Sequence, residues 1–142
     1  MINQEPSVLL VDDDVVFGRI MQKVAVNQHV RLKYVSSVKD LERMPYQKFD
    51  VALLDFDLGT ITGIQLSRLL PQYFGSVPVV LISQYRDIPK HLWPTMVRGF
   101  VPKASGAFEI LSETRRLLEA VGEGYLSEGQ ESPKRSVHDT LI

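Results

Sequence analysis

Short apolar runs rich in valine, leucine and isoleucine recur along the chain, separated by longer stretches in which apolar residues follow a helical period. Runs of this length predict strands, and the third and fourth are so uniformly apolar that helices should cover both of their faces. Alternation of the two patterns is typical of βα units around a parallel sheet. We therefore expect a doubly wound (βα)5 fold with strands at roughly Ser7–Val11, Val30–Val35, Asp50–Leu54, Pro78–Ile82 and Gly99–Val101.

Four stretches between and after these strands show helical spacing of apolar residues. Asp14 is placed to cap the first predicted helix, and Pro71 should end the third, because proline disrupts a helix interior. The last helix should begin through Ser105 and Gly106. The apolar positions, helix by helix, are Phe17, Ile20, Met21 and Val24; Leu41 and Met44; Ile64, Leu66, Leu69 and Leu70; and Phe108, Leu111, Leu117, Leu118 and Val121.

Two regions depart from the regular alternation. Pro89 and Pro94 lie between the fourth and fifth strands, so we expect a short or broken fourth helix there. After Val121 the chain is polar and rich in glycine, with too few apolar residues to build a core. This pattern predicts one domain over residues 1–121 and a polar tail or linker over residues 122–142.

The composition fits one domain and excludes several kinds of partner. The chain has 142 residues, of which 44% are hydrophobic, enough to bury a single core. Because the sequence has 16 basic and 17 acidic residues, no general electrostatic attraction to nucleic acid or anionic membrane is expected. The sequence has no cysteine and no apolar stretch near the ~20 residues of a membrane span. We expect a cytoplasmic protein that binds neither nucleic acid nor membrane directly.

Polar residues follow four of the predicted strands. Asp12 and Asp13 follow the first strand and Asp55 follows the third, while Ser83 and Lys103 follow the fourth and fifth. The carboxyl ends of parallel strands meet at one edge, where ligands of such sheets bind. Three carboxylates gathered there would repel one another, so a cation and Lys103 are needed to compensate them. Oxygen ligands without cysteine or suitably spaced histidine favour Mg2+.

A carboxylate held beside a divalent cation and a lysine can attack a phosphoryl donor, and Asp55 is the best-placed nucleophile. A simpler interpretation is that Asp12, Asp13 and Asp14 form a turn and helix cap, while Asp55 and Asp57 flank a surface loop. That interpretation suits each residue alone, but convergence of all the polar groups on one edge favours the chemistry. The three histidines lack ligand spacing and are expected on the surface: His29, His91 and His138.

Four segments resemble the receiver domains of two-component response regulators, and the resemblance extends from Ser7 to Val121. It implies a flavodoxin-like (βα)5 fold and a switch rather than a conventional enzyme. The implied phosphoryl source is a phosphohistidine on a sensor histidine kinase or phosphotransfer protein. The segments are VLLVDDD at 8–14, VALLDFDLG at 51–59 with Gly63, VVLIS at 79–83 and GFVPK at 99–103.

The resemblance also implies a role for each matching residue. Asp55 would be the phosphoacceptor, and Asp12 and Asp13 the acidic pair that binds Mg2+ together with Asp55. Asp57 would offer the metal its backbone carbonyl.

The remaining matches concern the switch. Ser83 would be the switch hydroxyl, Lys103 the family lysine and Phe100 the switch aromatic, although Phe100 is equally well explained as a core residue. Inward movement of Ser83 toward a phosphoryl group would let Phe100 rotate and change the surface near the broken fourth helix. Partner binding or homodimerisation is expected on that surface.

Departures from the family pattern keep other functions open. Gly59 replaces a common proline, which should loosen the loop after Asp55, and Gln84 replaces a small residue beside the phosphoryl position. With the disrupted fourth helix, Gln84 favours an alternative, a phosphorylation-independent interaction module on the receiver fold. A hydrolase with an aspartyl-phosphate intermediate would need a lid, and we find no segment long enough.

Two further segments resemble the LuxR-type (NarL/FixJ) subgroup, in which a receiver precedes a DNA-binding domain. They are KAS at 103–105 and AVGEGYLS at 120–127. The residues after 131 are too few for such an output domain, so a single-domain regulator and a receiver cut from a longer protein both remain open.

Overall fold

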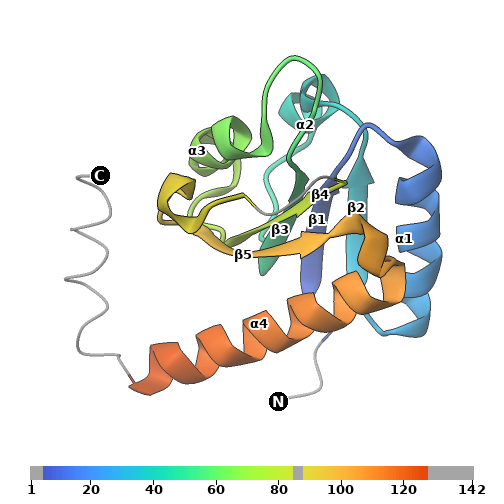
Figure 1. Cartoon of the computed structure of the whole chain (residues 1–142). Helices are drawn as coiled ribbons and strands as arrows, with labels where there is room; N and C mark the ends of the chain where they lie inside the picture. Colours follow the sequence, from blue (N-terminus) through green and yellow to red (C-terminus); the bar gives the residue numbers. More distant parts are fainter. Residues whose placement is uncertain (1–4, 85–87, 128–142) are drawn as a thin grey trace.

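The computed structural model describes residues 5–84 and 88–127, with side chains described as far as Ala120. Its centre is a five-stranded parallel sheet in the order β2-β1-β3-β4-β5, flanked by helices on both faces (Figure 1). This confirms the predicted doubly wound (βα)5 fold. The strands are β1 (Ser7–Val11), β2 (Arg31–Val35), β3 (Val51–Asp55), β4 (Val79–Ser83) and β5 (Val97–Pro102); the helices are α1 (Val15–Asn27), α2 (Val38–Arg43), α3 (Gly63–Phe74) and α4 (Ala107–Ser127), with 3-10 turns η1 (Lys90–Leu92) and η2 (Lys103–Ser105).

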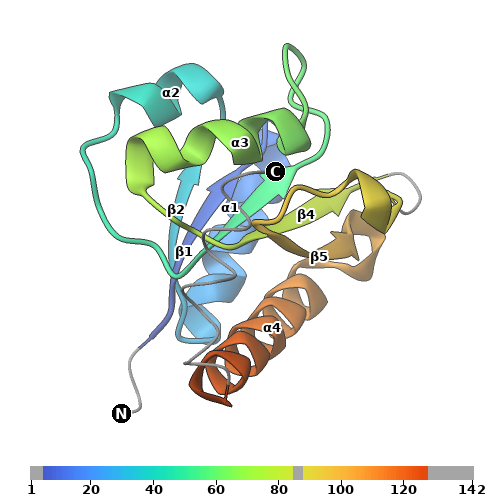
Figure 2. The same ribbon diagram turned by 90° about the vertical axis from the view of Figure 1, so that its left-hand side faces the viewer.

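Two apolar layers hold the sheet between its helices. The helices α2 and α3 lie on one side of the sheet and α4 on the other (Figure 2). Every residue of β3 and β4 is buried, as predicted for strands covered on both faces. Side chains that alternate along the strands therefore feed two separate cores. One core includes Leu9, Leu54, Leu66, Leu70 and Leu81; the other includes Leu10, Met21, Leu53, Ile82 and Ile110.

The helix α1 begins where the sequence predicts, whereas its buried side chains differ in part from those predicted. Asp14 caps the helix by accepting a hydrogen bond from the backbone N–H of Phe17 at 3.1 Å. The buried positions of α1 are Gly18, Met21 and Ala25, while Ile20 is 48% exposed. The prediction that Ile20 belongs to the apolar stripe was therefore wrong, because α1 packs through the face that carries Gly18, Met21 and Ala25.

The prediction that Pro71 ends the third helix was also wrong, since α3 continues to Phe74. Proline removes its own N–H bond and crowds the preceding turn, but burial of Leu70 and Phe74 stabilises the last turn. Gly75 ends the helix instead, at φ 76, in the left-handed region that glycine tolerates.

The two regions that depart from the predicted alternation have different structures. Between Ile88 and Met96 the chain forms only the η1 turn, which confirms a broken fourth helix among the described residues of this segment. The indole N–H of Trp93 donates to the carbonyl of Ile88 at 3.0 Å and closes the turn. By contrast, α4 extends beyond Val121 to Ser127, because propagation of an existing helix costs less than its nucleation.

Of the predicted tail, residues 122–127 are thus helical and residues 128–142 lie outside the described part of the chain. Phe108, assigned to the apolar stripe of this helix, is 66% exposed, so that assignment was wrong as well. A helix with the length and hydropathy of a membrane span is absent from the part of the chain that the structure describes.

The core predicts a clear difference between two leucine truncations. Leu66→Ala should lower the free energy of unfolding by about 2 to 5 kcal/mol, because Leu66 is fully buried and its removal leaves a cavity. Leu92→Ala is the matched control, since Leu92 is 50% exposed, and should cost less than about 1 kcal/mol. Urea unfolding measures both values, and equal losses would contradict the assigned core.

Candidate functional site

Three carboxylates meet at the carboxyl edge of the sheet, where the strand order reverses. The register pairs Val11 of β1 with Leu54 of β3, so Asp12 and Asp55 leave adjacent strands at the same level. Asp12, Asp13 and Asp55 each offer one oxygen, and these oxygens lie within 4.8 Å of one another. The convergence predicted from the strand ends is confirmed.

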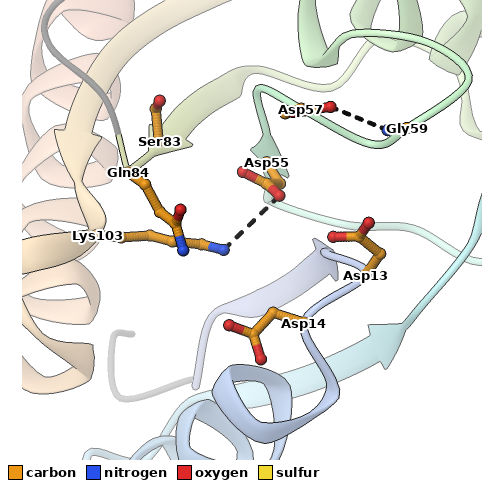
Figure 3. Close-up of a pocket in the computed structure, with 8 residues that line it drawn as sticks. All are labelled: Asp13, Asp14, Asp55, Asp57, Gly59, Ser83, Gln84 and Lys103. Carbon is orange, nitrogen blue, oxygen red and sulfur yellow. Dashed lines mark hydrogen bonds and ion pairs between the residues drawn. The ribbon is translucent and has the colours of Figure 1, made fainter.

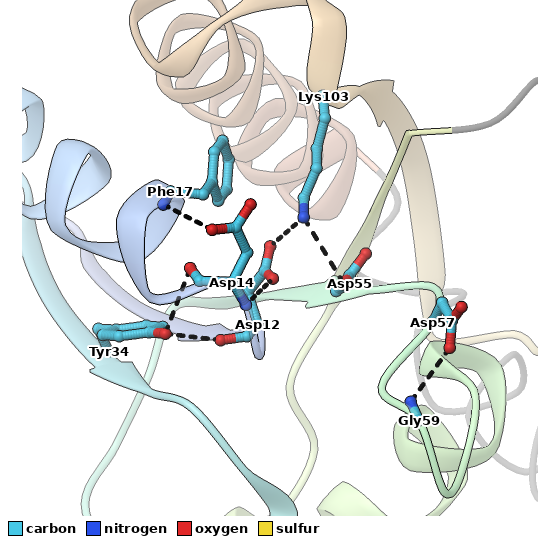
Figure 4. A network of polar contacts seen from close by, with 8 residues as sticks. All are labelled: Asp12, Asp14, Phe17, Tyr34, Asp55, Asp57, Gly59 and Lys103. Atoms are coloured by element: carbon cyan, nitrogen blue, oxygen red, sulfur yellow. Dashed lines mark hydrogen bonds and ion pairs between the residues drawn. The ribbon is translucent and has the colours of Figure 1, made fainter.

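Lys103 reaches the same point from the carboxyl end of β5, the outermost strand next to β4. It follows β5 and begins the η2 turn, and its side chain is largely buried. Its Nζ lies 2.8 Å from Oδ2 of Asp12 and 3.7 Å from Oδ2 of Asp55 (Figure 4). The ammonium also lies 4.8 Å from the ring centroid of Phe17, a cation–π arrangement that further fixes its place.

Asp12 is the most deeply buried member of the cluster. Its Oδ1 accepts a hydrogen bond from the backbone N–H of Asp14 at 2.9 Å. Its Oδ2 is buried, and among the described residues the polar contact of this atom is the ammonium of Lys103 rather than a well-aligned hydrogen bond. A buried carboxylate oxygen that has an ion pair but no hydrogen bond can serve as a ligand of a bound cation.

The pKa values of the cluster show that burial disfavours the charged form of its carboxyl groups. Burial raises the pKa of Asp12, and contact with Lys103 offsets only part of that rise. Burial, followed by the charge of Asp12, raises the pKa of Asp55 to about 7. Although burial lowers the pKa of the Lys103 ammonium, its close contact and charge interaction with Asp12 outweigh burial and raise it. One lysine therefore compensates these carboxylates incompletely.

A cavity of about 260 Å³ opens beside the cluster (Figure 3). Ser83, at the end of β4, is buried and lines it, as predicted. Gln84, the residue expected to stand beside the phosphoryl position, is exposed and lines the same cavity. The cavity is lined by Asp13, Asp14, Asp55, Asp57, Gly59, Ser83, Gln84 and Lys103.

The loop after β3 is tighter than its sequence suggests. Oδ1 of Asp57 accepts a hydrogen bond from the N–H of Gly59 at 3.1 Å, and Gly59 has φ 86. Proline, fixed near φ −65°, could not adopt this conformation, so glycine serves a tight turn rather than a loose loop. Gly63 then passes close to the site, because a Cβ there would lie 2.6 Å from the carbonyl oxygen of Asp55.

Phe100 does not line the cavity. It is partly buried and packs against the core on the α3 side of the sheet, a cluster that includes Ile88 and Val97 and also has Trp93 and Met96 packed against it. This position is compatible with both interpretations of Phe100, as a core aromatic and as a switch.

Sequence reasoning missed two aromatic neighbours of the cluster, Phe17 over Lys103 and Tyr34 on β2. The hydroxyl of Tyr34 donates to the backbone carbonyl of Asp12 at 2.7 Å. Two signals were available: the alternation of β2 places Leu32 and Tyr34 on one face, and an isolated glycine inside a helix usually has a packing reason. That glycine is Gly18, which lies against the Tyr34 ring.

The donor set fits a hard divalent cation. Asp12, Asp13 and Asp55 supply only oxygen atoms, and the buried Oδ2 of Asp12 lacks a full set of partners. Mg2+ accepts one or a few carboxylates and keeps several waters, for which the adjoining cavity has room. Asp57, in the loop after β3, lines the same cavity, and its backbone carbonyl could supply a further oxygen.

The raised pKa of Asp55 predicts a pH-dependent stability of the metal-free protein. Between its unfolded value of 3.8 and about 7 the folded chain binds more protons than the unfolded chain, so stability is lost as pH rises through this window. Urea unfolding in EDTA should show that loss, and Asp55→Asn should reduce it. Asp50→Asn, at the exposed opposite end of β3, should retain it. Identical pH profiles for the parent and Asp55→Asn would contradict the assigned environment.

Curated proteins match this chain over only part of their own length. The chain is 26% identical over 113 residues to the uncharacterized transcriptional regulatory protein YbdJ of Bacillus subtilis (strain 168), which covers 79% of this chain and 50% of YbdJ. The chain spans half or less of the length of the curated relatives it matches.

Solved structures agree on the fold. A CheY-like response regulator receiver domain protein from Methanospirillum hungatei JF-1 superposes with a TM-score of 0.71 at 14% identity, over 84% of this chain and 98% of that chain. The beryllofluoride-activated DrrB receiver domain gives a TM-score of 0.64 at 20% identity, over 81% and 98% of the two chains. At these identities the likeness establishes architecture alone.

The family is established by a separate match. The family model of the response regulator receiver domain matches residues 8–115, a range that contains the described strands apart from the first residue of β1, together with the buried cluster of Asp12, Asp55 and Lys103. With the acidic edge and the strand order, this match shows that the chain belongs to the response regulator receiver domain family.

Proposed function

We propose that this receiver domain takes a phosphoryl group onto Asp55 from the phosphohistidine of a sensor histidine kinase or phosphotransfer protein. The observation that carries the proposal is the position of Asp55 at the end of β3, where it lines the cavity and lies 3.7 Å from the ammonium of Lys103. A buried carboxylate with acidic neighbours and one cation is a candidate nucleophile for phosphoryl transfer.

The proposed step is an in-line displacement. A carboxylate oxygen of Asp55 forms a bond to phosphorus while the phosphorus–nitrogen bond of the donor breaks, and the released imidazole takes up a proton. Lys103 neutralises part of the charge on the transferred oxygens. Ser83 lines the same cavity, and rotation of its side chain would let the hydroxyl donate to one of them.

The proposal includes Mg2+ as the resident cation. Asp12, Asp13 and Asp55 would hold it by their carboxylates, and Asp57 by its backbone carbonyl. When bound, magnesium supplies positive charge that neutralises the carboxylates and the phosphoryl oxygens. Deprotonation of Asp55, which its raised pKa opposes near neutral pH, is favoured by any such positive charge.

The signal is proposed to leave through Ser83 and Phe100. A phosphoryl group adds strong acceptors that attract the Ser83 hydroxyl, and Phe100 then rotates in the core beside the broken fourth helix. The segment from Ile88 to Met96 has only the η1 turn, so its packing should change more readily than that of a full helix. The altered surface would bind a partner or a second copy. Residues 85–87, part of the segment expected to respond, lie outside the described residues.

The proposal extends to the wider pathway. The segments at 103–105 and 120–127 resemble LuxR-type regulators, and YbdJ is named as a transcriptional regulatory protein. These observations support a role of the chain in cytoplasmic control of transcription, with residues 1–121 as the receiver unit and the following residues as its connection to an output.

One observation favours a second function, a phosphorylation-independent interaction module. Gln84 lines the cavity where the incoming phosphoryl group would lie, and an amide side chain there narrows the approach to Asp55. In that case the acidic edge would be structural, and the partner would bind the surface near η1 without any modification.

Incubation with acetyl phosphate and magnesium, followed by intact mass measurement, decides between these functions. The parent chain should gain the mass of one phosphoryl group, whereas Asp55→Asn and a sample in EDTA should gain none. Asp50→Asn, immediately before the same strand, is the matched control and should be labelled like the parent. Labelling of Asp55→Asn would refute the assigned acceptor, and no labelling of the parent would favour the interaction module.

A further inference from the structure

Tyr34 reaches from β2 to the acidic turn, the residues 12–14 that connect β1 to α1. Its hydroxyl donates to the backbone carbonyl of Asp12 at 2.7 Å, and the carbonyl of Asp14 lies 3.5 Å from the same hydroxyl (Figure 4). Because a phenol has one hydrogen, the shorter contact is the principal bond. We infer that Tyr34 is a positioning residue, which holds the acidic turn so that its carboxylates stay beside Asp55.

The acidic turn needs such a restraint. Oxygens of Asp12, Asp13 and Asp55 lie within 4.8 Å of one another, and repulsion between like charges at this separation acts to displace the turn. Two bonds to β2 oppose that displacement. The N–H of Asp12 donates to the carbonyl of Val35 at 3.2 Å, and the carbonyl of Asp12 accepts from the Tyr34 hydroxyl. Asp12 is therefore held at both ends of its backbone by neighbouring residues of one strand.

The helix α1 is shaped to admit the tyrosine ring. A Cβ at Gly18 would lie 2.3 to 2.6 Å from three ring atoms of Tyr34, including the carbon that bears the hydroxyl. A side chain at this position would displace the ring and with it the bond to Asp12. Glycine is unfavourable inside a helix, so its place here has a packing explanation. The ring thus lies between β2 and α1 with its polar end at the acidic turn.

Two phenylalanine variants test this role. Tyr34→Phe removes the hydroxyl but leaves the ring over Gly18. Tyr73→Phe is the matched control, because it removes a hydroxyl that donates to the exposed Glu42 at 3.2 Å, away from the cavity. Amide hydrogen exchange by NMR in EDTA reports on the turn, and calorimetric titration with magnesium chloride reports on its carboxylates. Only the magnesium measurement rests on the proposed function.

In Tyr34→Phe, exchange of the Asp14 amide, which donates to Asp12, should accelerate on the order of tenfold, while the amide of Leu53 in β3 is unchanged. The dissociation constant for magnesium should rise roughly three- to tenfold. Tyr73→Phe should change neither quantity.

Unchanged exchange at Asp14, equal acceleration at Asp14 and Leu53, or an unchanged magnesium affinity in Tyr34→Phe would each overturn the positioning role. If the parent chain binds no magnesium, the proposed function fails, and the exchange of Asp14 alone decides the inference.

Discussion

Two aspartate carboxylates and one lysine ammonium are buried side by side at the carboxyl edge of the sheet. Removal of charges from water costs several kcal/mol per ion unless partners compensate them. Lys103 contacts both Asp12 and Asp55, but burial still raises the pKa of each carboxyl. The cluster is therefore short of positive charge. This shortage favours binding of a cation at the edge. In its absence, the rest of the fold must hold the carboxylates together against their repulsion.

The two apolar layers supply that restraint. Because β3 and β4 are buried along their whole length, Asp55 and Ser83 leave strands that cannot shift without exposing core residues. Close approaches complete the frame at the edge itself. Gly63 lets α3 begin next to the Asp55 carbonyl, and Gly18 admits the ring of Tyr34 beside the acidic turn. The geometry of the site thus depends on small residues as much as on charged ones.

The strand ends and their carboxylates could be predicted from sequence because both follow from local patterns. Periodic apolar runs placed the strands to within two residues, and the rule for parallel sheets brought Asp12, Asp55 and Lys103 to one edge. Helix ends were less accessible. Pro71 lies within α3 because tertiary burial of its last turn outweighs the local cost of a proline in a helix, and sequence alone does not give the extent of that burial.

Other features depend on pairs of residues that are distant in sequence. Tyr34 and Gly18 lie on different elements, and neither residue by itself indicates that a ring packs against the helix. Similarly, Gly59 suggested a loose loop until its φ of 86 and its bond to Asp57 showed a specific turn. A periodicity argument treats each element separately, whereas these contacts arise only when β2, α1 and the loop after β3 are brought together.

The most direct test of the account is a crystal structure of the parent chain grown with magnesium and beryllofluoride, a mimic of the phosphoryl group. The account predicts beryllium bonded to a carboxylate oxygen of Asp55, its fluorine atoms in contact with Lys103 and Ser83, and magnesium on the carboxylates of Asp12 and Asp13. An unmodified Asp55 beside an otherwise intact cavity, or beryllofluoride bound at another carboxylate, would contradict it.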